Sequence, residues 1–424
     1  MIARPSTSLS APIAAALLLA LCAPAAAQVE APLETHPEID TRGLIYGKVL
    51  TTRGETYEGR LRWDGEESFW GDFFNGTKDE LPFFDRIPDE QQRRSRPIRV
   101  FGITVGSRWE RISDRRSTMA RFGDVAAIEP RRSDNVVLHM KGGDRIELDG
   151  GSNDIGADVE IWDRQRGEVT VPWHRVERIE LGPAPSDLPV EAYRLKGKVT
   201  STAGTFEGFI EWDNDERLSD EILDGDDPDG KRHKIPMGDI RLIERHSRSS
   251  ARVVMKDGTE LVLDDTNDVD AGNRGIVIED PRYGRVELSW SAFVRLELSD
   301  ERSCGPPYQD FEPGTHLRGT VTTRGKQLRG RLVYDVDESE TWEFLNGEHD
   351  DGIEFDVPFA LIRSITPIRD AASRVELISG ASLELSGTTD VGGDNAGVLV
   401  IAGGEAGTTT YVPWDDVDRI DFEH

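Results

Sequence analysis

The stretch at 317–335 reads LRGTVTTRGKQLRGRLVYD, and two near-copies of it stand earlier in the chain. The copies are LKGKVTSTAGTFEGFIEWD at 195–213 and IYGKVLTTRGETYEGRLRWD at 45–64. In each copy, apolar and polar residues alternate on both sides of a glycine-containing turn. This pattern is typical of two half-buried β-strands joined in a hairpin. A chain that repeats such a unit is built from structural repeats.

A second motif follows each copy. It is VELISGASLEL at 375–385, VVMKDGTELVL at 253–263 and VLHMKGGDRIEL at 137–148, and each copy leads on to a tryptophan, at Trp414, Trp290 and Trp173. These tryptophans are 124 and 117 residues apart, and this spacing sets the repeat length. The alternation again predicts strands, and no long amphipathic helix is indicated.

Three tandem segments follow from this spacing. We define segment 1 as 42–182, segment 2 as 193–298 and segment 3 as 315–424, with proline-rich linkers at 182–192 and 299–314. Each segment has two halves of about 50 to 60 residues, a length that suits one small barrel. Segment 1 carries roughly 28 more residues than the others between its motifs, which indicates an insertion.

The second half of each segment resembles the Sm-like family, whose fold is a five-stranded SH3-like barrel. The positions that carry the resemblance in segment 3 are Val375, Leu377, Gly380, Gly387, Asp390 and Asn395. The resemblance implies an all-β fold of six small SH3-like (Sm-like) barrels, arranged as three tandem two-barrel repeats. It does not carry RNA binding over, because Val-Pro-Trp at 412–414 stands where the family has Arg-Gly.

The N-terminus is typical of a secretory signal peptide over 1–27. Arg4 precedes a continuous apolar run at 13–21, and small residues before Gln28 offer a cleavage site after Ala27. Lipidation at Cys22 is the less favoured alternative, because Leu21 stands where a lipoprotein signal has a small residue. We therefore expect a secreted or periplasmic protein. The mature chain has no apolar run of the ~18 residues that a membrane-spanning helix requires.

Charge and motif content narrow the function. The chain has 51 Lys and Arg against 80 Asp and Glu, a net charge of −29, which excludes a nucleic-acid partner bound through a basic face. The motifs of metalloproteases, serine hydrolases and phosphate-binding loops are missing. We therefore expect a non-catalytic structural or adaptor module of the cell envelope, binding an envelope protein or a second copy. A calcium- or glycan-binding repeat protein is the alternative, and an envelope hydrolase is third.

Two acidic loops are the candidate metal sites. Clustered carboxylates can supply the oxygen ligands that calcium prefers, although neither loop matches the twelve-residue calcium loop, and the alternative is solvated turns. The expected ligands are Asp213, Asp215, Glu216, Asp335, Asp337 and Glu338. No other cofactor is expected. The aromatic residues that recur beside these loops suggest either a glycan platform or, more often at fixed strand positions, a barrel core.

The insertion in segment 1 is the candidate partner-binding site. Residues 85–121 hold ten arginines and five acidic residues within an otherwise acidic chain. Guanidinium groups pair two carboxylate oxygens at once, so this composition predicts docking on an acidic surface of the same chain or of a partner, and a solvated loop is the alternative. The expected contact residues are Arg93, Arg94, Arg96, Arg99, Arg115 and Arg116.

Overall fold

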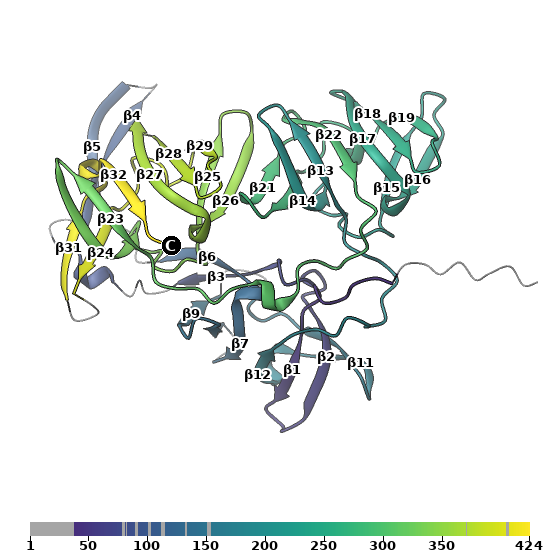
Figure 1. Ribbon diagram of the computed structural model, residues 1–424, viewed down its shortest axis with the longest axis horizontal. Coiled ribbons are helices and arrows are strands. Elements are labelled where there is room, and N and C mark those ends of the chain that lie inside the picture. Colours follow the sequence, from purple (N-terminus) through teal and green to yellow (C-terminus); the bar gives the residue numbers. More distant parts are fainter. Residues whose placement is uncertain are drawn as a thin grey trace, which may run out of the picture. The chain divides into compact units, whose positions relative to one another are not determined.

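The structure is a computed structural model. It describes residues 38–78, 81, 83–89, 92–100, 103–111, 115–131, 134–150, 154–369, 371–403 and 407–424, with backbone only at 93–100 and 103–111. The expected signal peptide (1–27) and Cys22 lie outside these residues. The described residues form 32 strands and eight single-turn 3-10 helices (Figure 1). The all-β prediction is confirmed.

Segment 1 forms one ten-stranded antiparallel sheet. Its strands are β1 (Tyr46–Thr51), β2 (Thr56–Trp63), β3 (Phe73–Lys78), β6 (Arg116–Arg121), β7 (Val125–Pro130), β8 (Asn135–Met140), β9 (Arg145–Asp149), β10 (Val159–Asp163), β11 (Gly167–Val171) and β12 (Val176–Leu181). Their order is β11-β10-β2-β1-β12-β7-β8-β9-β3-β6. The 3-10 helices are η1 (Phe84–Arg86), η2 (Phe122–Asp124) and η3 (Trp173–Arg175). The insertion adds a separate hairpin between β3 and β6, made of β4 (Arg93–Val100) and β5 (Ile103–Arg111).

Segment 2 repeats this strand order with no inserted hairpin. Its strands are β13 (Lys196–Ser201), β14 (Thr205–Trp212), β15 (Ile222–Asp226), β16 (Arg232–Pro236), β17 (Ile240–Ser247), β18 (Ser250–Met255), β19 (Glu260–Asp264), β20 (Ile276–Asp280), β21 (Gly284–Leu288) and β22 (Phe293–Leu298), with η4 (Met237–Asp239) and η5 (Asn267–Val269). The paired order is β21-β20-β14-β13-β22-β17-β18-β19-β15-β16.

Segment 3 has the same order again. Its strands are β23 (Arg318–Thr323), β24 (Lys326–Tyr334), β25 (Phe344–His349), β26 (Ile353–Pro358), β27 (Ile362–Arg369), β28 (Ala372–Leu377), β29 (Ser382–Ser386), β30 (Val398–Ala402), β31 (Thr408–Val412) and β32 (Arg419–Phe422), with η7 (Phe359–Leu361) and η8 (Trp414–Asp416); η6 (Tyr308–Asp310) lies in the linker. The order is β31-β30-β24-β23-β32-β27-β28-β29-β25-β26.

This pairing differs from the predicted six barrels. The first strand of each segment pairs with the last, as in Gly47↔Leu181 and Gly197↔Leu298, so the two halves of a segment are interleaved rather than successive. Each segment is an open series of ten strands, and no closed barrel forms among the described strands. The physical reason is that alternating polarity identifies the buried face of a strand but not its partner.

The glycines of the recurring stretch mark where these distant strands meet. A Cβ on Gly59 would lie 2.0 Å from the carbonyl oxygen of Trp162, and one on Gly208 would lie 1.9 Å from that of Glu279. Both glycines therefore sit inside a strand at a close backbone approach, rather than in a turn. The equivalent Gly330 has the same constraint against Ile401, at 2.3 Å.

The recurring aromatic residues form the cores. Trp63, Trp212 and Tyr334 are at most 1% exposed. The indole Nε1 of Trp212 donates to the carbonyl oxygen of Asp268 at 2.9 Å, and Trp290 packs edge-on against it at 6.2 Å. The core interpretation of these aromatics is confirmed, and a glycan platform at the three positions is wrong because their rings are inaccessible.

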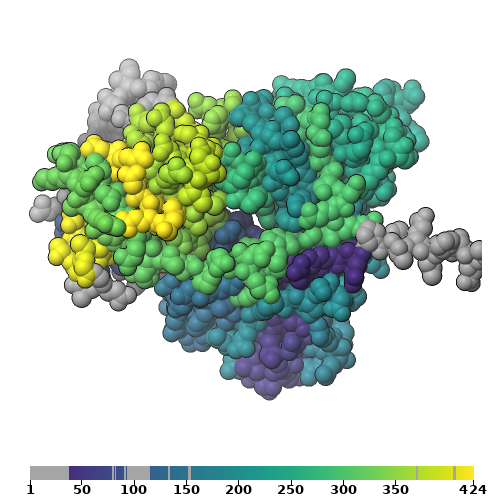
Figure 2. Space-filling model, viewed as in Figure 1, coloured from purple at the N-terminus to yellow at the C-terminus, as the bar shows by residue number. Residues whose placement is uncertain are grey.

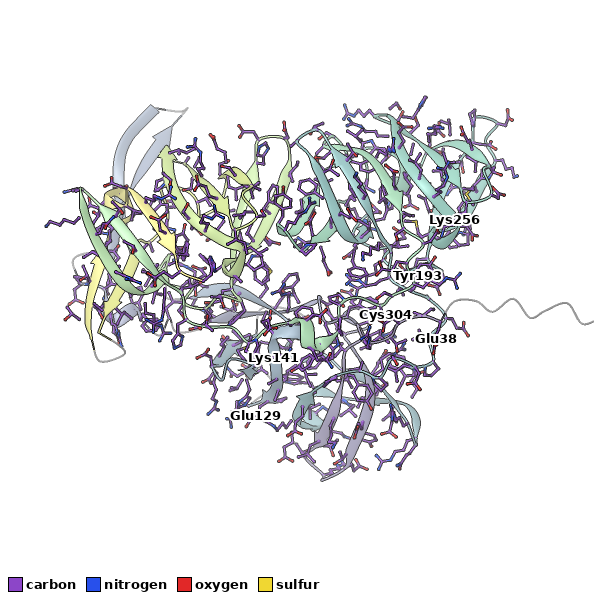
Figure 3. The ribbon with its side chains drawn as sticks, in the orientation of Figure 1. Glu38, Glu129, Lys141, Tyr193, Lys256 and Cys304 are labelled. Atoms are coloured by element: carbon purple, nitrogen blue, oxygen red, sulfur yellow. The ribbon has the colours of Figure 1, made fainter. Side chains whose placement is uncertain are left out.

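Contacts between segments are extensive. Strand β21 pairs with β26 through Arg285↔Asp356 to Leu288↔Ile353, which joins segments 2 and 3 in one sheet (Figure 1). The 299–314 linker, in green, lies against segment 1 (Figure 2), where the Tyr308 hydroxyl donates to the Val125 carbonyl oxygen at 2.8 Å. Lys141, labelled in Figure 3, comes from segment 1. Its Nζ lies over the Tyr308 ring, 3.4 Å from the ring centroid.

Candidate functional site

A cavity of about 780 Å³ lies where the three segments and the 299–314 linker meet. Segment 1 contributes residues around β3 and η2, segment 2 the β13–β14 and β20–β21 hairpins, and segment 3 the loop before β25. Among its lining residues are Phe73, Arg121, Phe209, Glu279, Arg285, Phe311, Trp342 and Phe344. Because no single segment forms it, the cavity depends on the contacts that hold the segments together.

One wall of the cavity is an arginine between aromatic rings. The Arg121 guanidinium lies 5.4 Å from the Phe311 centroid and 5.3 Å from that of Phe344. Its Nε donates to the buried carboxylate of Asp124 at 3.0 Å. Phe73 packs edge-on against Phe344 at 5.3 Å. Cation–π and edge-to-face contacts of this kind fix the side chains before anything binds.

Glu279, on another wall of the cavity, forms an ion pair with the buried Arg194. Arg194 is 2% exposed, and its Nη1 donates to Glu279 at 3.1 Å while Nη2 makes a second contact with the same carboxylate. Burial would raise the pKa of Glu279, but the charge and hydrogen bonds of Arg194 outweigh it and hold that pKa below its usual value. Trp342, 4% exposed, has an indole Nε1 with no hydrogen-bond partner in the described part of the chain. The cavity therefore offers aromatic surface and fixed charges.

The first predicted metal loop is held by an arginine. The carboxylate of Asp213 is fully buried; it accepts a hydrogen bond from the backbone N–H of Arg274 and a 2.8 Å bond from its Nη2. Asp215 is exposed and pairs with the same Arg274 at 3.0 Å. Oxygens of Asp213, Glu216 and Asp268 lie within 4.8 Å of one another, so this loop brings together two of its predicted ligands and a third that the sequence did not indicate.

The second predicted metal loop binds a lysine of segment 1. Lys78 Nζ lies 2.7 Å from Asp337 Oδ1 and 2.5 Å from Glu343 Oε1, with all three side chains at most 9% exposed. Burial alone would lower the pKa of Lys78, but the two carboxylates outweigh it and raise that pKa. The loop is therefore a docking site between segments.

The loop that follows Trp63, Trp212 or Tyr334 has acidic residues at equivalent positions in all three segments. Burial raises the pKa of both Glu67 and Glu216 to about 8, and one oxygen of each is buried with no partner among the described residues. The equivalent loop of segment 1, at 64–67, was not among the predicted metal sites, although it also has three acidic residues in four and follows a core tryptophan. The equivalent positions are Asp64, Glu67 and Asp154; Asp213, Glu216 and Asp268; and Asp335, Glu338 and Asp390, and among the described residues only the segment 2 set brings all three carboxylates within 4.8 Å of one another.

The arginine-rich insertion is described only in part. Arg93, Arg94, Arg96 and Arg99 lie in β4, and their side chains lie outside the described residues. Arg115 pairs with Asp149 of the same segment at 2.7 Å. Burial raises the pKa of Asp335 to about 8 and that of Asp390 to about 6, and the charge of nearby Arg116, in β6, opposes part of this rise. Among the predicted arginines, Arg116 thus faces the acidic groups of another segment.

The chain that leads into the insertion packs on segment 3 through three apolar residues, Leu81, Phe84 and Ile87. Leu81, Phe84 and Ile87 are 2–5% exposed and cluster with residues of β24, β30 and the loops beside them. Those residues are Val333, Val336, Ala396, Leu399 and Ile401. An apolar triplet at 81, 84 and 87 was the available signal. The entry into the insertion, at 81–87, therefore docks within the chain by apolar contact, flanked by the Lys78 ion pair.

Cys304, which becomes the single cysteine once the expected signal peptide is removed, lies in the linker. Cys304 is labelled in Figure 3. It is 1% exposed and packs with Leu44 and Phe69. Burial raises the pKa of its thiol to about 11, which makes it a poor nucleophile. None of the helices in the described part of the chain has the length and apolar character needed to cross a membrane.

Comparisons with known proteins add little. No protein-family model matches the chain, and no curated protein matches it. Among solved structures, a chain described as "Streptogramin B lyase structure" aligns at 10% identity over 84% of this chain and 99% of its own, with a TM-score of 0.10. A TM-score this low carries no argument about fold or function.

Proposed function

We propose that this is a non-catalytic secreted or periplasmic β-repeat protein, a structural or adaptor module of the cell envelope that binds a partner protein in the cavity between its segments. The observation that carries this proposal is the lining of that cavity. Tryptophan and arginine are enriched at the residues that dominate protein–protein affinity, and such residues lie in preformed, desolvated pockets. Trp342, Arg121 and Arg285 supply them here.

The rigidity of the cavity supports the same function. Lys78 joins segment 1 to segment 3, and Arg217 of segment 2 donates to Asp72 of segment 1 at 3.1 Å. A binding surface whose side chains and segments are fixed in advance loses less entropy when a partner binds. An adaptor built from repeats needs its segments fixed relative to one another, because its binding surface would otherwise be divided among units that move separately.

The experiment is capture from an envelope extract followed by measurement on the purified partner. Phe209, half-buried on the cavity wall, is replaced by alanine, and Ile378, 45% exposed and not among the lining residues, is the matched control. We expect Phe209→Ala to weaken binding by about 30-fold, equivalent to about 2 kcal/mol, and Ile378→Ala to leave it unchanged. Equal affinities for the two variants would contradict the proposal.

The predicted six barrels are retained in this proposal, with a different assignment of strands to each barrel. Within segment 2, the strands β13, β14, β20, β21 and β22 make one five-stranded set, and β15 to β19 make the other. We infer that each set corresponds to one small SH3-like barrel, open along one side and assembled from non-contiguous strands. The identical order in segments 1 and 3 supports six such sets in three tandem pairs.

Calcium binding is the second candidate, favoured by the convergence of Asp213, Glu216 and Asp268. Because Arg274 occupies the Asp213 carboxylate, calcium would have to displace it. The variant Arg274→Ala should therefore bind calcium more tightly than the parent chain in a calcium titration, and Asp213→Asn should bind it more weakly. Absence of calcium binding in both the parent and Arg274→Ala would eliminate this candidate.

A further inference from the structure

A mixed cluster of ligand-type side chains lies away from the cavity wall, at the contact of segments 1 and 3. One ligand atom from each of Asp144, His316 and Glu340 lies within 4.8 Å of the other two. Asp144 comes from the turn between β8 and β9, His316 from the start of segment 3, and Glu340 from the loop between β24 and β25. These side chains can converge only if the backbone of both segments is held in place.

The backbone holds these positions on each side. His316 forms a β-bridge with Glu340, which sets the two side chains opposite one another. The turn that carries Asp144 closes through the backbone N–H of Met140, which donates to the Asp144 carbonyl oxygen at 2.9 Å. That turn also lies against the chain before His316, because a Cβ on Gly142 would be 2.4 Å from the Gly314 carbonyl oxygen.

Glu340 has a binding capacity that the chain does not use. Its Oε1 accepts from Arg331 Nη2 at 3.1 Å and contacts His316 Nδ1 at 2.7 Å. Its Oε2 is buried and has no hydrogen-bond partner among the described residues, while the side chain is 7% exposed. A buried carboxylate oxygen without a partner costs free energy comparable to a lost hydrogen bond or more, so it is a position where a ligand is expected.

We propose that Asp144, His316 and Glu340 form a site for a divalent transition-metal ion, with zinc as the cation that fits best. Zinc binds imidazole nitrogen together with carboxylate oxygen, whereas calcium and magnesium take oxygen ligands. Two carboxylates against the single charge of Arg331 leave the cluster short of positive charge, which a divalent ion supplies. Three protein ligands leave a fourth zinc position for water or a bound group.

A neighbouring cavity gives the metal ion access to this site, and a bound ion would affect the large cavity. A cavity of about 560 Å³ is lined by Thr315, His316 and Arg318 and gives an entry path for the ion. A bound zinc would join Asp144 of segment 1 to Glu340 of segment 3. Glu340 directly precedes Thr341 and Trp342, which line the large cavity. Zinc would therefore brace the partner-binding surface, although its binding can be measured with no partner present.

The experiment uses the full mature chain, freed of metal with a chelator and dialysed against micromolar zinc. We expect about one zinc per chain, and a visible absorption band of a four-coordinate site when cobalt is used as the probe. His316→Ala should weaken zinc binding by at least about 100-fold, more than changes outside the ligand set typically cost. The matched control is His349→Ala, which removes a histidine paired with Asp351 at 3.6 Å and should bind zinc like the parent.

Zinc should also raise the melting temperature of the parent and of His349→Ala but not of His316→Ala. If His316→Ala fails to fold, Asp144→Asn replaces it, because that change keeps the shape of the side chain. The proposal is overturned if the parent binds no zinc under these conditions. It is also overturned if both His316→Ala and Asp144→Asn bind zinc like the parent, or if Asp213→Asn alone abolishes binding.

Discussion

Replacing Lys78 with methionine should be among the most damaging single changes in this protein. At an effective dielectric constant of about 20, each of its two carboxylate contacts supplies about 6 kcal/mol of Coulomb attraction. Burying three ions costs several kcal/mol for each, so the intact cluster contributes little net stability. Methionine removes the attraction and leaves Asp337 and Glu343, 4–5% exposed, buried without their cation. The expected loss is about 3–5 kcal/mol.

The assay is urea unfolding at pH 7 followed by tryptophan fluorescence. Lys48→Met is the matched control, because Lys48 is 51% exposed and 3.6 Å from Glu58, a geometry that contributes at most about 1 kcal/mol. Adding Asp337→Asn and Glu343→Gln to Lys78→Met should recover most of the loss, since the uncompensated charges are then gone. A loss for Lys78→Met no larger than for Lys48→Met would refute the buried ion pair.

Three further predictions follow from other contacts. Glu67 has a pKa of about 8 in the folded chain and ionises near 4.5 when unfolded, so its contribution to stability falls as pH rises from 4.5 to 8. With chelator present, the melting temperature of Glu67→Gln should rise relative to that of the parent across this pH range. The melting temperature of Glu55→Gln, a change at an exposed residue, should follow that of the parent. The fragment 193–298 should melt below the fragment 193–424, because it lacks the β21–β26 pairing, and equal melting temperatures in calorimetry would count against that contact. Phe84→Ala should cost about 3 kcal/mol in urea unfolding and speed proteolysis of the insertion, whereas an unchanged cleavage rate would mean that the apolar docking does not form.

The sequence predicted the strands and the cores well because both depend on local pattern. Alternating polarity around Trp63 and Trp212 places those rings on a buried face whichever strands they pair with. Strand partners are a different matter, since they depend on contacts over more than 100 residues. The strongest clue was the glycines that recur inside the second strand of each copy, Gly59, Gly208 and Gly330. Their lack of a side chain is required by the non-local crossing strand.

The candidate sites were harder to predict, because they arise between segments. Nothing near Lys78 in the sequence marks it as buried, since it is one lysine at a strand end in a highly charged chain. The acidic loops were recognised, but a carboxylate cluster looks the same whether it awaits calcium or already holds Arg274 or Lys78. His316 and Asp144 are 172 positions apart and share no motif, so only the packing of segment 3 on segment 1 brings them together.

One face of the repeated fold has diverged in a way that explains the arrangement of the whole site. It is the outer face of the strand pairs β2–β10, β14–β20 and β24–β30. In segment 1 the face closes on itself, with Arg62 paired to Glu160. In segment 2 it presents Phe209 and Glu279 to the large cavity. In segment 3 it carries an apolar patch, Val333, Leu399 and Ile401, beside Arg331.

These three faces specify where the insertion goes. Leu81, Phe84 and Ile87 need an apolar surface, and Val333 provides one where segment 2 has Glu211 and segment 1 has Arg62. Packing Leu81, Phe84 and Ile87 against Glu211 or Arg62 would bury that charged side chain without a partner, at a cost of several kcal/mol. The insertion is thus directed to segment 3, and the face of segment 2 remains open to form a wall of the cavity. Divergence at equivalent positions, rather than any new fold, turns three copies of one sheet into one binding surface.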